Sequence, residues 1–376
     1  MTRLPDFRLE TYFTRWEFTA RHHLTASDSQ TMTMAELLAL AGPEDREAWD
    51  NLALGYTETF GDPGLRQAIA GMYEQVEADD VICFGGAQEG INLAMQVLLE
   101  PGDHAVVLTP NYQSAETIPL SLCEVTGVAL DERQDWALDL DAVEAALRPN
   151  TKVLSVNFPN NPTGTLIPAA DFARLAGLCE ERGIRLFSDE VYRGLEREPD
   201  RALPQAADLS ATALSLNVTS KSLGLPGLRI GWIACRDREL RARLERAKHY
   251  TTICNSAPSE VLARIAITAR ERILARNRGI IAENLPAFDA FFAEFPELFE
   301  WRAPQGGCVA YPRYLGPDGV EDFCTALVEQ AGVLLMPASM FRSDLTPTPT
   351  DRFRIGVGRR DPGPALDAFA DWLRKR

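Results

Sequence analysis

The sequence has little of what marks several large classes of protein. Positive charge is in deficit: 38 Lys and Arg stand against 54 Asp and Glu, and the formal net charge of −16 argues against nucleic acid or an anionic membrane as a partner. Four histidines, two of them adjacent at His22 and His23, show no spacing typical of metal ligands, so no metal is expected. No apolar run reaches membrane-spanning length, and the first residues lack the pattern of a signal peptide.

Cysteine pairs are also missing. The seven cysteines are scattered and odd in number, and none forms a C-x-x-C pair. We therefore expect reduced, mostly buried thiols in a protein of the cytoplasm. The Gly-rich run from Gly85 to Gly90 lacks the G-x-G-x-x-G spacing, so a dinucleotide-binding fold gets little support.

Short apolar runs and helical patterns alternate through the middle of the chain. A length of 376 residues is large for one core and predicts two lobes. Apolar runs typical of buried strands lie at 81–84, 105–108, 153–156, 186–188, 213–216 and 230–234, and helical spacing lies at 87–99, 139–147 and 169–182. This order predicts an α/β fold with a mostly parallel sheet covered by helices on both faces. Such sheets bind ligands where their strands end.

The pattern changes after a long helical stretch at about 255–295. Strand-like runs at 307–311, 333–336 and 353–357, with an amphipathic helix at 320–331, predict a smaller mixed lobe. The Pro- and Thr-rich stretch 345–351 is expected to be a surface loop.

Lys221 lies among small residues in Thr219-Ser220-Lys221-Ser222, and Arg229 follows eight positions later, past a Gly-rich turn. An amine that bonds to an aldehyde needs unhindering neighbours and a site that lowers its pKa. A guanidinium suits a phosphate, because its planar fork donates two parallel hydrogen bonds. Together they indicate pyridoxal phosphate, which is both an aldehyde and a phosphate ester. Taken alone, such a pair is more often found on a solvated surface.

Three further segments follow predicted strands. At Gly85–Gly90, free amides at the start of a helix would face an anion, although such turns are common without a ligand. The stretch 157–164 is a turn rich in Asn, Pro and Gly, from which an Asn amide could bond to a ligand oxygen. Asp189 could pair with a protonated ring nitrogen, and Tyr192 could reach a phenolic oxygen. Alone, a carboxylate at a strand end is usually a helix cap or a solvated group.

In this order the motifs resemble those of the class I/II aminotransferases of pyridoxal-phosphate fold type I. The resemblance covers roughly residues 50 to 376. It rests on Gly86-Ala87-Gln88, Asn161-Pro162-Thr163-Gly164, Asp189-x-x-Tyr192, Ser220-Lys221 and Arg229, with Tyr56-x-x-x-x-Gly61-x-x-x-Leu65-Arg66 before them and Phe353-Arg354-Ile355 after them. The stretch Leu9-Glu10-x-Tyr12-Phe13 and the run from Leu225 to Trp232 are similar to those of capreomycidine-synthase-like members.

The resemblance implies the organisation of the chain. A large domain at 49–265 would hold the cofactor on a mostly parallel seven-stranded sheet flanked by helices. A smaller α+β domain would follow at 266–376, and an N-terminal segment at 1–48 would pack with it.

The resemblance also implies a role for each matching residue. Lys221 would hold pyridoxal phosphate through a Schiff base and then move a proton between the substrate Cα and the cofactor. Asp189 would keep the ring nitrogen protonated, which makes the cofactor an electron sink. Further contacts to the ring would come from Asn161, Tyr192 and Tyr112. The phosphate would be held by Gly86, Ala87, Gln88, Ser220 and Arg229.

Two implied contacts involve other molecules. Tyr56 would come from the partner subunit of a homodimer, and Arg354, together with Asn161, would hold the substrate carboxylate. One position departs from the family's pattern: many relatives have a hydroxyl residue three positions before the lysine, where this chain has Val218. Either Thr219 supplies that contact or the phosphate has fewer contacts.

The expected function is the transfer of an amino group between an α-amino acid and a 2-oxo acid. A β-elimination lyase, or a cyclase acting on an arginine derivative, would use the same residues, because the bond broken depends on which Cα bond lies perpendicular to the ring. A regulatory protein is disfavoured, since no DNA-binding segment is expected before residue 50 and the charge opposes DNA binding. Glu17 and Asp28, near Trp16, could form an acidic pocket for a basic amino acid, although a solvated helix surface is the expected account of both.

Overall fold

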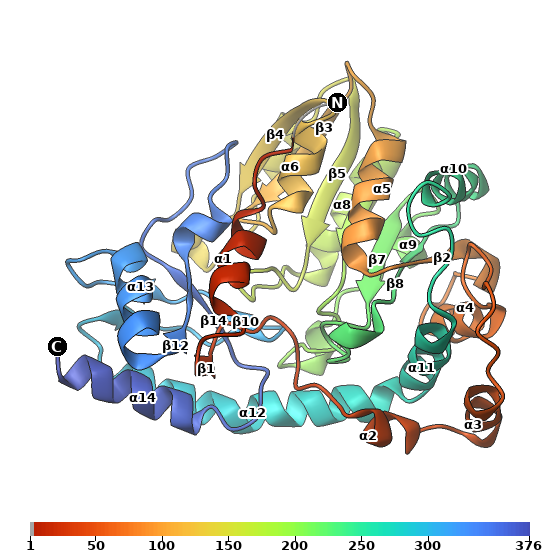
Figure 1. Ribbon diagram of the computed structural model, residues 1–376. Coiled ribbons are helices and arrows are strands. Elements are labelled where there is room, and N and C mark those ends of the chain that lie inside the picture. Colours follow the sequence, from red (N-terminus) through yellow and green to blue (C-terminus); the bar gives the residue numbers. More distant parts are fainter. Residues whose placement is uncertain (1–3) are drawn as a thin grey trace.

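The computed structural model describes residues 4–376, so the first three residues of the predicted N-terminal segment lie outside the described part. At its centre is a seven-stranded sheet with the order β2-β8-β7-β6-β5-β3-β4 (Figure 1). Strand β8 is antiparallel to both of its neighbours, and the other adjacent pairs are parallel. The strands are β2 (Val81–Phe84), β8 (Gly231–Ala234), β7 (Leu214–Val218), β6 (Arg185–Asp189), β5 (Thr151–Asn157), β3 (His104–Thr109) and β4 (Glu124–Ala129). The expected α/β fold with a mostly parallel sheet is confirmed.

Strand β4 is the one that the apolar pattern does not mark. It lies at the edge of the sheet, beside β3, and Val128 is its one buried position. An edge strand meets solvent along one side, so it does not need the continuous apolar run of a central parallel strand.

Helices cover both faces of the sheet. Side chains of α5 (Ala87–Leu98), α6 (Ser114–Leu120) and α10 (Arg238–Lys248) belong to one apolar cluster with the sheet. Those of α7 (Leu140–Ala146), α8 (Ala169–Glu181) and α9 (Ala206–Leu209) belong to a second cluster. The predicted helices at 87–99, 139–147 and 169–182 are therefore confirmed to within a residue or two at their ends.

The C-terminal part of the chain forms a smaller unit beside the sheet (Figure 1). A three-stranded antiparallel sheet has the order β10-β14-β13, and a two-stranded one joins β9 to β11. The strands are β9 (Phe299–Glu300), β10 (Val309–Ala310), β11 (Arg313–Tyr314), β12 (Val333–Leu334), β13 (Met336–Pro337) and β14 (Phe353–Gly356), and the helices are α13 (Val320–Ala331) and α14 (Gly363–Arg374). The stretch 345–351 contains no helix or strand, as expected.

The N-terminal segment connects the two units. Strand β1 (His22–His23) pairs in parallel with β12, far along the chain in the smaller unit. Helix α1 (Arg8–Trp16) crosses between the two units in Figure 1. The other helices are α2 (Met34–Leu38), α3 (Pro43–Asp50), α4 (Pro63–Ala70), α11 (Ala257–Thr268) and α12 (Arg270–Glu294). The predicted domain boundaries at residues 48 and 265 stay a prediction.

Within residues 4–376, every helix is too short or too polar to cross a bilayer. Even α12, with 25 residues, carries charged side chains along its length.

Candidate active site

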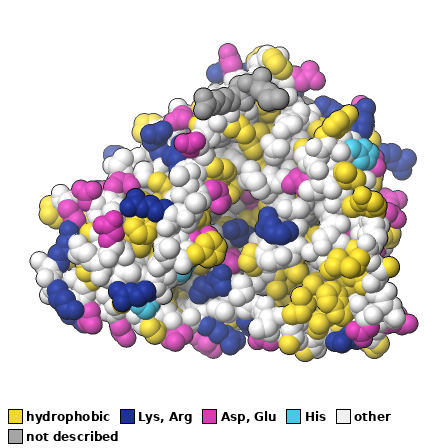
Figure 2. All heavy atoms as spheres, viewed as in Figure 1, with side chains coloured by type: hydrophobic (Ala, Val, Ile, Leu, Met, Phe, Trp, Pro, Cys, Tyr) yellow, Lys and Arg dark blue, Asp and Glu magenta, His cyan; other side chains and the backbone are white. Residues whose placement is uncertain are grey.

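A cavity of about 520 Å³ lies where the parallel strands end, between the sheet and α1. Its wall includes ten of the predicted site residues: Ala87, Gln88, Tyr112, Asn161, Asp189, Tyr192, Ser220, Lys221, Arg229 and Arg354. Figure 2 shows basic side chains near the middle of this face of the molecule, between the two units. Tyr56 is not among the lining residues and is 94% exposed, so the chain does not bring it to its own cavity.

Lys221 follows β7 and reaches into the cavity. Its Nζ donates a hydrogen bond to Oγ of Ser27 at 2.8 Å, and the phenol of Tyr192 donates to the backbone oxygen of the same serine at 3.0 Å. Burial lowers the pKa of Lys221, while the charge of Asp28 opposes that shift and the charge of Arg354 adds to it. A buried amine with a lowered pKa spends more time in its neutral, nucleophilic form.

Asp189 is the last residue of β6. Burial raises the pKa of its carboxyl from the ordinary 3.8 to about 7, although the backbone N–H of Val191 donates to it at 3.2 Å and Lys221 acts in the opposite direction. A carboxyl whose ionisation is penalised by its surroundings is suited to a cationic ligand group, because that group would stabilise the charged form. The protonated nitrogen of a pyridine ring has that character.

Arg354 is a buried guanidinium that lacks a counter-ion. It is 1% exposed, and Nη1 and Nη2 donate to Oδ1 of Asn161 at 3.2 Å and to the backbone oxygen of Thr25 at 2.9 Å. Its Nε has no acceptor, and none of the ion pairs formed by residues 4–376 includes it. Burial lowers the pKa of this guanidinium. Because an isolated buried cation is costly, the arrangement favours binding of a carboxylate.

A cradle for an anion lies at the start of α5. The helix begins after Gly86, which has a φ of 103°, a backbone conformation that glycine adopts readily. No side chain accepts a hydrogen bond from the first backbone amides of the helix. A Cβ atom at Gly86 would lie 2.4 Å from Nη2 of Arg229. The hydroxyl of Ser220, 6% exposed, has no hydrogen-bond partner among the described residues. Free amides, an orphaned hydroxyl and a guanidinium together suit a phosphate.

Thr219 was considered as the source of the hydroxyl contact that Val218 cannot make. Val218 lines the cavity, but Thr219 is fully buried, and its Oγ1 donates to the backbone oxygens of Ile230 at 3.0 Å and Leu225 at 3.3 Å. The Thr219 hydroxyl is therefore engaged within the chain and is not free to take the place of the one that Val218 lacks.

The N-terminal segment forms a wall that sequence reasoning did not assign. Phe7, Leu9, Glu10, Phe13 and Ser27 all line the cavity. The expectation of a solvated helix surface is wrong for Asp28, which lies outside any helix, is 9% exposed and pairs with Arg359 at 2.7 Å. Glu17 is half-buried at the C-terminal end of α1. Two signals pointed to this segment: the similarity of 9–13 to a subset of the family, and the acidic residues Glu17 and Asp28.

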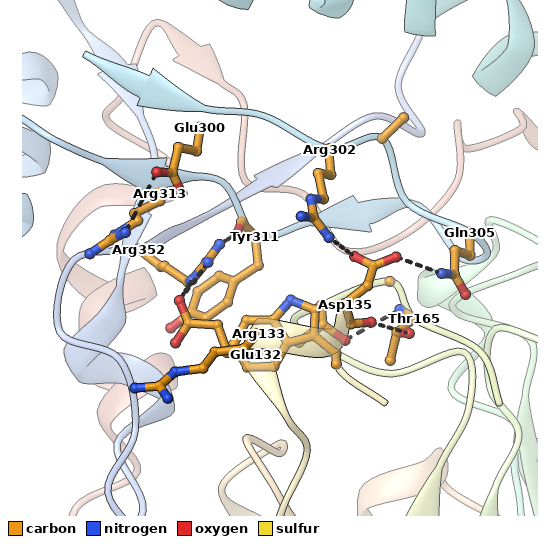
Figure 3. A pocket seen from close by; sticks show the side chains of 14 residues that line it. Glu132, Arg133, Asp135, Thr165, Glu300, Arg302, Gln305, Tyr311, Arg313 and Arg352 are labelled. Atoms are coloured by element: carbon orange, nitrogen blue, oxygen red, sulfur yellow. Dashed lines mark hydrogen bonds and ion pairs between the residues drawn. The ribbon is translucent and has the colours of Figure 1, made fainter. Parts of the chain in front are cut away.

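A second cavity of about 510 Å³ lies between the larger and smaller units, away from these residues. Figure 3 shows that most of its charged side chains face a partner of opposite charge, while Arg133 points away from the others. Arg302 pairs with Asp135 at 2.8 Å and Arg352 with Glu132 at 2.6 Å. These pairs join residues 132–135 of the larger unit to 302–352 of the smaller one.

The residues of the first cavity fit pyridoxal phosphate. The cradle at Gly86 suits its phosphate, Asp189 its ring nitrogen, and Lys221 its aldehyde. Arg354 remains free for the carboxylate of a substrate.

Comparison with known proteins agrees with this geometry. Residues 27–362 match the profile of the family described as aminotransferase class I and II. Capreomycidine synthase of Streptomyces vinaceus is 29% identical over 97% of this chain and 92% of its own length. A probable N-succinyldiaminopimelate aminotransferase of Mycobacterium tuberculosis is 30% identical over 78% of this chain and 77% of its own. A pyridoxal-phosphate-dependent aminotransferase of Streptococcus suis has a crystal structure with a TM-score of 0.91 and 29% identity, covering 99% of this chain and 98% of that one.

The anion cradle, the buried lysine and the family profile all occur on one chain. This protein therefore belongs to the class I and II aminotransferases, which use pyridoxal phosphate.

Proposed function

We propose that this protein transfers an amino group between an α-amino acid and a 2-oxo acid, with Lys221 as the residue that moves the proton. The observation that carries the proposal is the content of one cavity: a buried amine, a carboxyl whose pKa is raised to about 7, and a buried guanidinium without a counter-ion. Those three groups match the aldehyde and ring nitrogen of the cofactor and the carboxylate of the substrate.

The cofactor would be held at both ends. The amides of Ala87 and Gln88, the hydroxyl of Ser220 and the guanidinium of Arg229 would bind the phosphate. At the ring, Asp189 would bind the nitrogen, Asn161 and Tyr192 would lie at the 3′-oxygen, and Tyr112 at the ring face. When bound, pyridoxal phosphate supplies an electron sink for charge that develops at the substrate Cα.

The substrate would be oriented by Arg354. Two of its nitrogens already have acceptors, and Nε, which has none, would donate to the carboxylate. This contact would hold the Cα within reach of Lys221. The lysine amine, less basic because it is buried, would take the Cα proton and return it to the cofactor.

We also propose a homodimer in which Tyr56 reaches the partner's site. Tyr56, Leu54 and Tyr250 are 94%, 84% and 92% exposed, which is unusual for large apolar side chains. The segments around Tyr56 and Tyr250 lie near each other, because the hydroxyl of Thr57 donates a hydrogen bond to the backbone oxygen of Asn255 at 3.2 Å. Light scattering on the purified protein tests this: a monomer at micromolar concentration would contradict it.

The cytoplasm is the compartment that we propose. All seven cysteines are free thiols, with Cys123 and Cys254 half-buried and the other five buried. Free thiols suit a reducing compartment.

The absorption spectrum of the purified protein tests the main proposal. Titration with single amino acids should convert the bound cofactor to its amine form with at least one of them, and a 2-oxo acid should reverse the change. A protein that binds no pyridoxal phosphate would contradict the enzyme assignment.

A second candidate is a cyclase or lyase. It is favoured by the similarity to capreomycidine synthase, which extends over 97% of the chain and so includes the N-terminal wall of the cavity. Product analysis separates the two functions. Ammonia or a cyclised product formed without a 2-oxo acid, and with no amine form of the cofactor, would identify the second.

A further inference from the structure

One charged side chain in the cavity wall has no role in binding the cofactor or the substrate carboxylate. The wall contains three cations, Lys221, Arg229 and Arg354, and two carboxylates, Asp189 and Glu10. The proposed function uses all three cations and Asp189. Glu10 is left over, and it lies in the N-terminal wall rather than at the strand ends where the cofactor residues gather.

Helix α1 holds Glu10 in a defined place. Leu9 is 4% exposed, Tyr12 donates to the backbone oxygen of Leu335 at 2.8 Å, and the backbone N–H of Arg8 donates to Oε1 of Gln113 at 2.9 Å. The helix is therefore anchored to both units. The carboxylate of Glu10 accepts a hydrogen bond from the phenol of Tyr112 at 3.3 Å, which turns it toward the cavity.

Two further acidic side chains, Glu17 and Asp28, lie near Glu10, with the cations Lys221 and Arg359 acting against them at Glu17. Glu10, Phe13 and Glu17 are spaced three and four residues apart, so they share one face of the helix, and Phe13 lines the cavity. Burial, and then the charges of Glu10 and Asp28, raise the pKa of Glu17. His23, 4.0 Å from Glu17, has a pKa lowered by burial, so at neutral pH it adds little positive charge. Asp28 is paired with Arg359, while Glu10 has no cationic partner among the ion pairs of the described residues.

We propose that Glu10 selects amino acids whose side chain ends in a cation, a guanidinium or an ammonium. The proposal rests on the function argued above. A substrate held at its carboxylate by Arg354 would extend its side chain from the strand ends toward α1, where Glu10 accepts hydrogen bonds from the cationic end. Glutamate or aspartate would place a second carboxylate against Glu10 and would be rejected.

Titration of the holoenzyme tests the proposal. The rapid absorption change that precedes the amine form of the cofactor gives a dissociation constant for arginine and for citrulline, which has the same length and no charge, and for lysine and norleucine. Wild-type protein should bind at least one cation about tenfold more tightly than its neutral partner. Glu10→Gln should remove that difference while leaving the neutral amino acids within about twofold.

A matched control separates local from general charge effects. Glu329→Gln removes the same charge from a residue that faces Arg15 at 3.6 Å, on α1, and does not line the cavity. It should leave all four constants unchanged. The proposal would be overturned if Glu10→Gln weakened the binding of charged and neutral amino acids equally, or if the wild type bound citrulline and norleucine as tightly as arginine and lysine. Absence of the amine form of the cofactor would instead count against aminotransfer, because the binding constants do not depend on that step.

Discussion

Nη2 of Arg229 occupies the space that a side chain at Gly86 would need, since a Cβ atom there would lie 2.4 Å away. Arg229 itself has a positive φ of 53°, which is uncommon for a residue with a side chain. Its Nη2 donates to the backbone oxygen of Gly85 at 3.3 Å. The glycine and the arginine are thus two parts of one anion cradle, although they lie far apart in the sequence.

Gly86→Ala should weaken binding of pyridoxal phosphate. The substitution places a Cβ against Arg229 and also strains a backbone with a φ of 103°, so the guanidinium must move away from the phosphate. We expect the dissociation constant to rise about tenfold or more. Gly227→Ala is the control, because a Cβ at that position has nothing within 4 Å. Equal affinity in the two variants, measured by titration of the apoprotein, would remove Arg229 from the phosphate site.

Arg354→Lys should raise KM for amino acids by about 10- to 100-fold with a smaller effect on cofactor binding. A lysine keeps the charge but has one side-chain nitrogen, so it cannot contact Asn161, Thr25 and the carboxylate from three separate positions as the guanidinium does. Arg352→Lys provides the comparison, because that side chain belongs to the same strand region and pairs with Glu132 in the other cavity. If both variants raise KM equally, the effect comes from the fold and not from the carboxylate contact.

Asp189→Asn should inactivate the enzyme and stabilise the apoprotein above pH 7. Because the pKa of this carboxyl is raised to about 7 from 3.8, the folded chain keeps a proton that the unfolded chain releases. Its contribution to stability therefore falls as pH rises from about 4 to 7 and stays low above that. The asparagine amide would not ionise, so the variant should melt higher than wild type at pH 8 and at a similar temperature at pH 4.

The control for that experiment is Asp171→Asn, an acidic residue in the first turn of α8. The melting temperature of this variant should not rise above that of the wild type at pH 8. Activity of Asp189→Asn should fall by at least about 100-fold, as for loss of one preorganised electrostatic partner. A variant that melts lower than wild type at pH 8 would contradict the view that burial makes this carboxylate costly.

The sequence marks the residues proposed for the cofactor side of the site, because they lie in local motifs that carry the resemblance to the family. Asn161, Asp189 and Lys221 each lie at or just after the end of a buried strand, and the ends of parallel strands meet at one edge of the sheet. Their position could therefore be predicted without knowing the packing, while their roles came from the resemblance to the family. The same reasoning locates six strands and misses β4, whose edge position leaves no apolar run.

The substrate side could not be predicted in this way. Ser27 and Lys221 are 194 positions apart, and their contact depends on how β1 pairs with β12 in the smaller unit. Glu10 is brought to the cavity by a helix docked through contacts with Gln113 and Leu335. No periodicity within 1–48 encodes such long-range pairing, so the contacts of Ser27 and Glu10 could not be predicted from the sequence.

Ser27→Ala should lower kcat with little change in KM. The Ser27 hydroxyl accepts a hydrogen bond from Nζ of Lys221 at 2.8 Å, so it positions the amine and favours its protonated form. Without that acceptor the pKa of the amine should fall further, and the acidic limb of the kcat profile should move to lower pH. KM should stay within about twofold, because Arg354 would still hold the carboxylate.

Ser29→Ala is the control, because it deletes a buried hydroxyl two positions away that does not line the cavity. It should leave kcat and KM unchanged. A Ser27→Ala variant with wild-type kcat and an unmoved pH profile would show that Lys221 needs no positioning from the N-terminal segment.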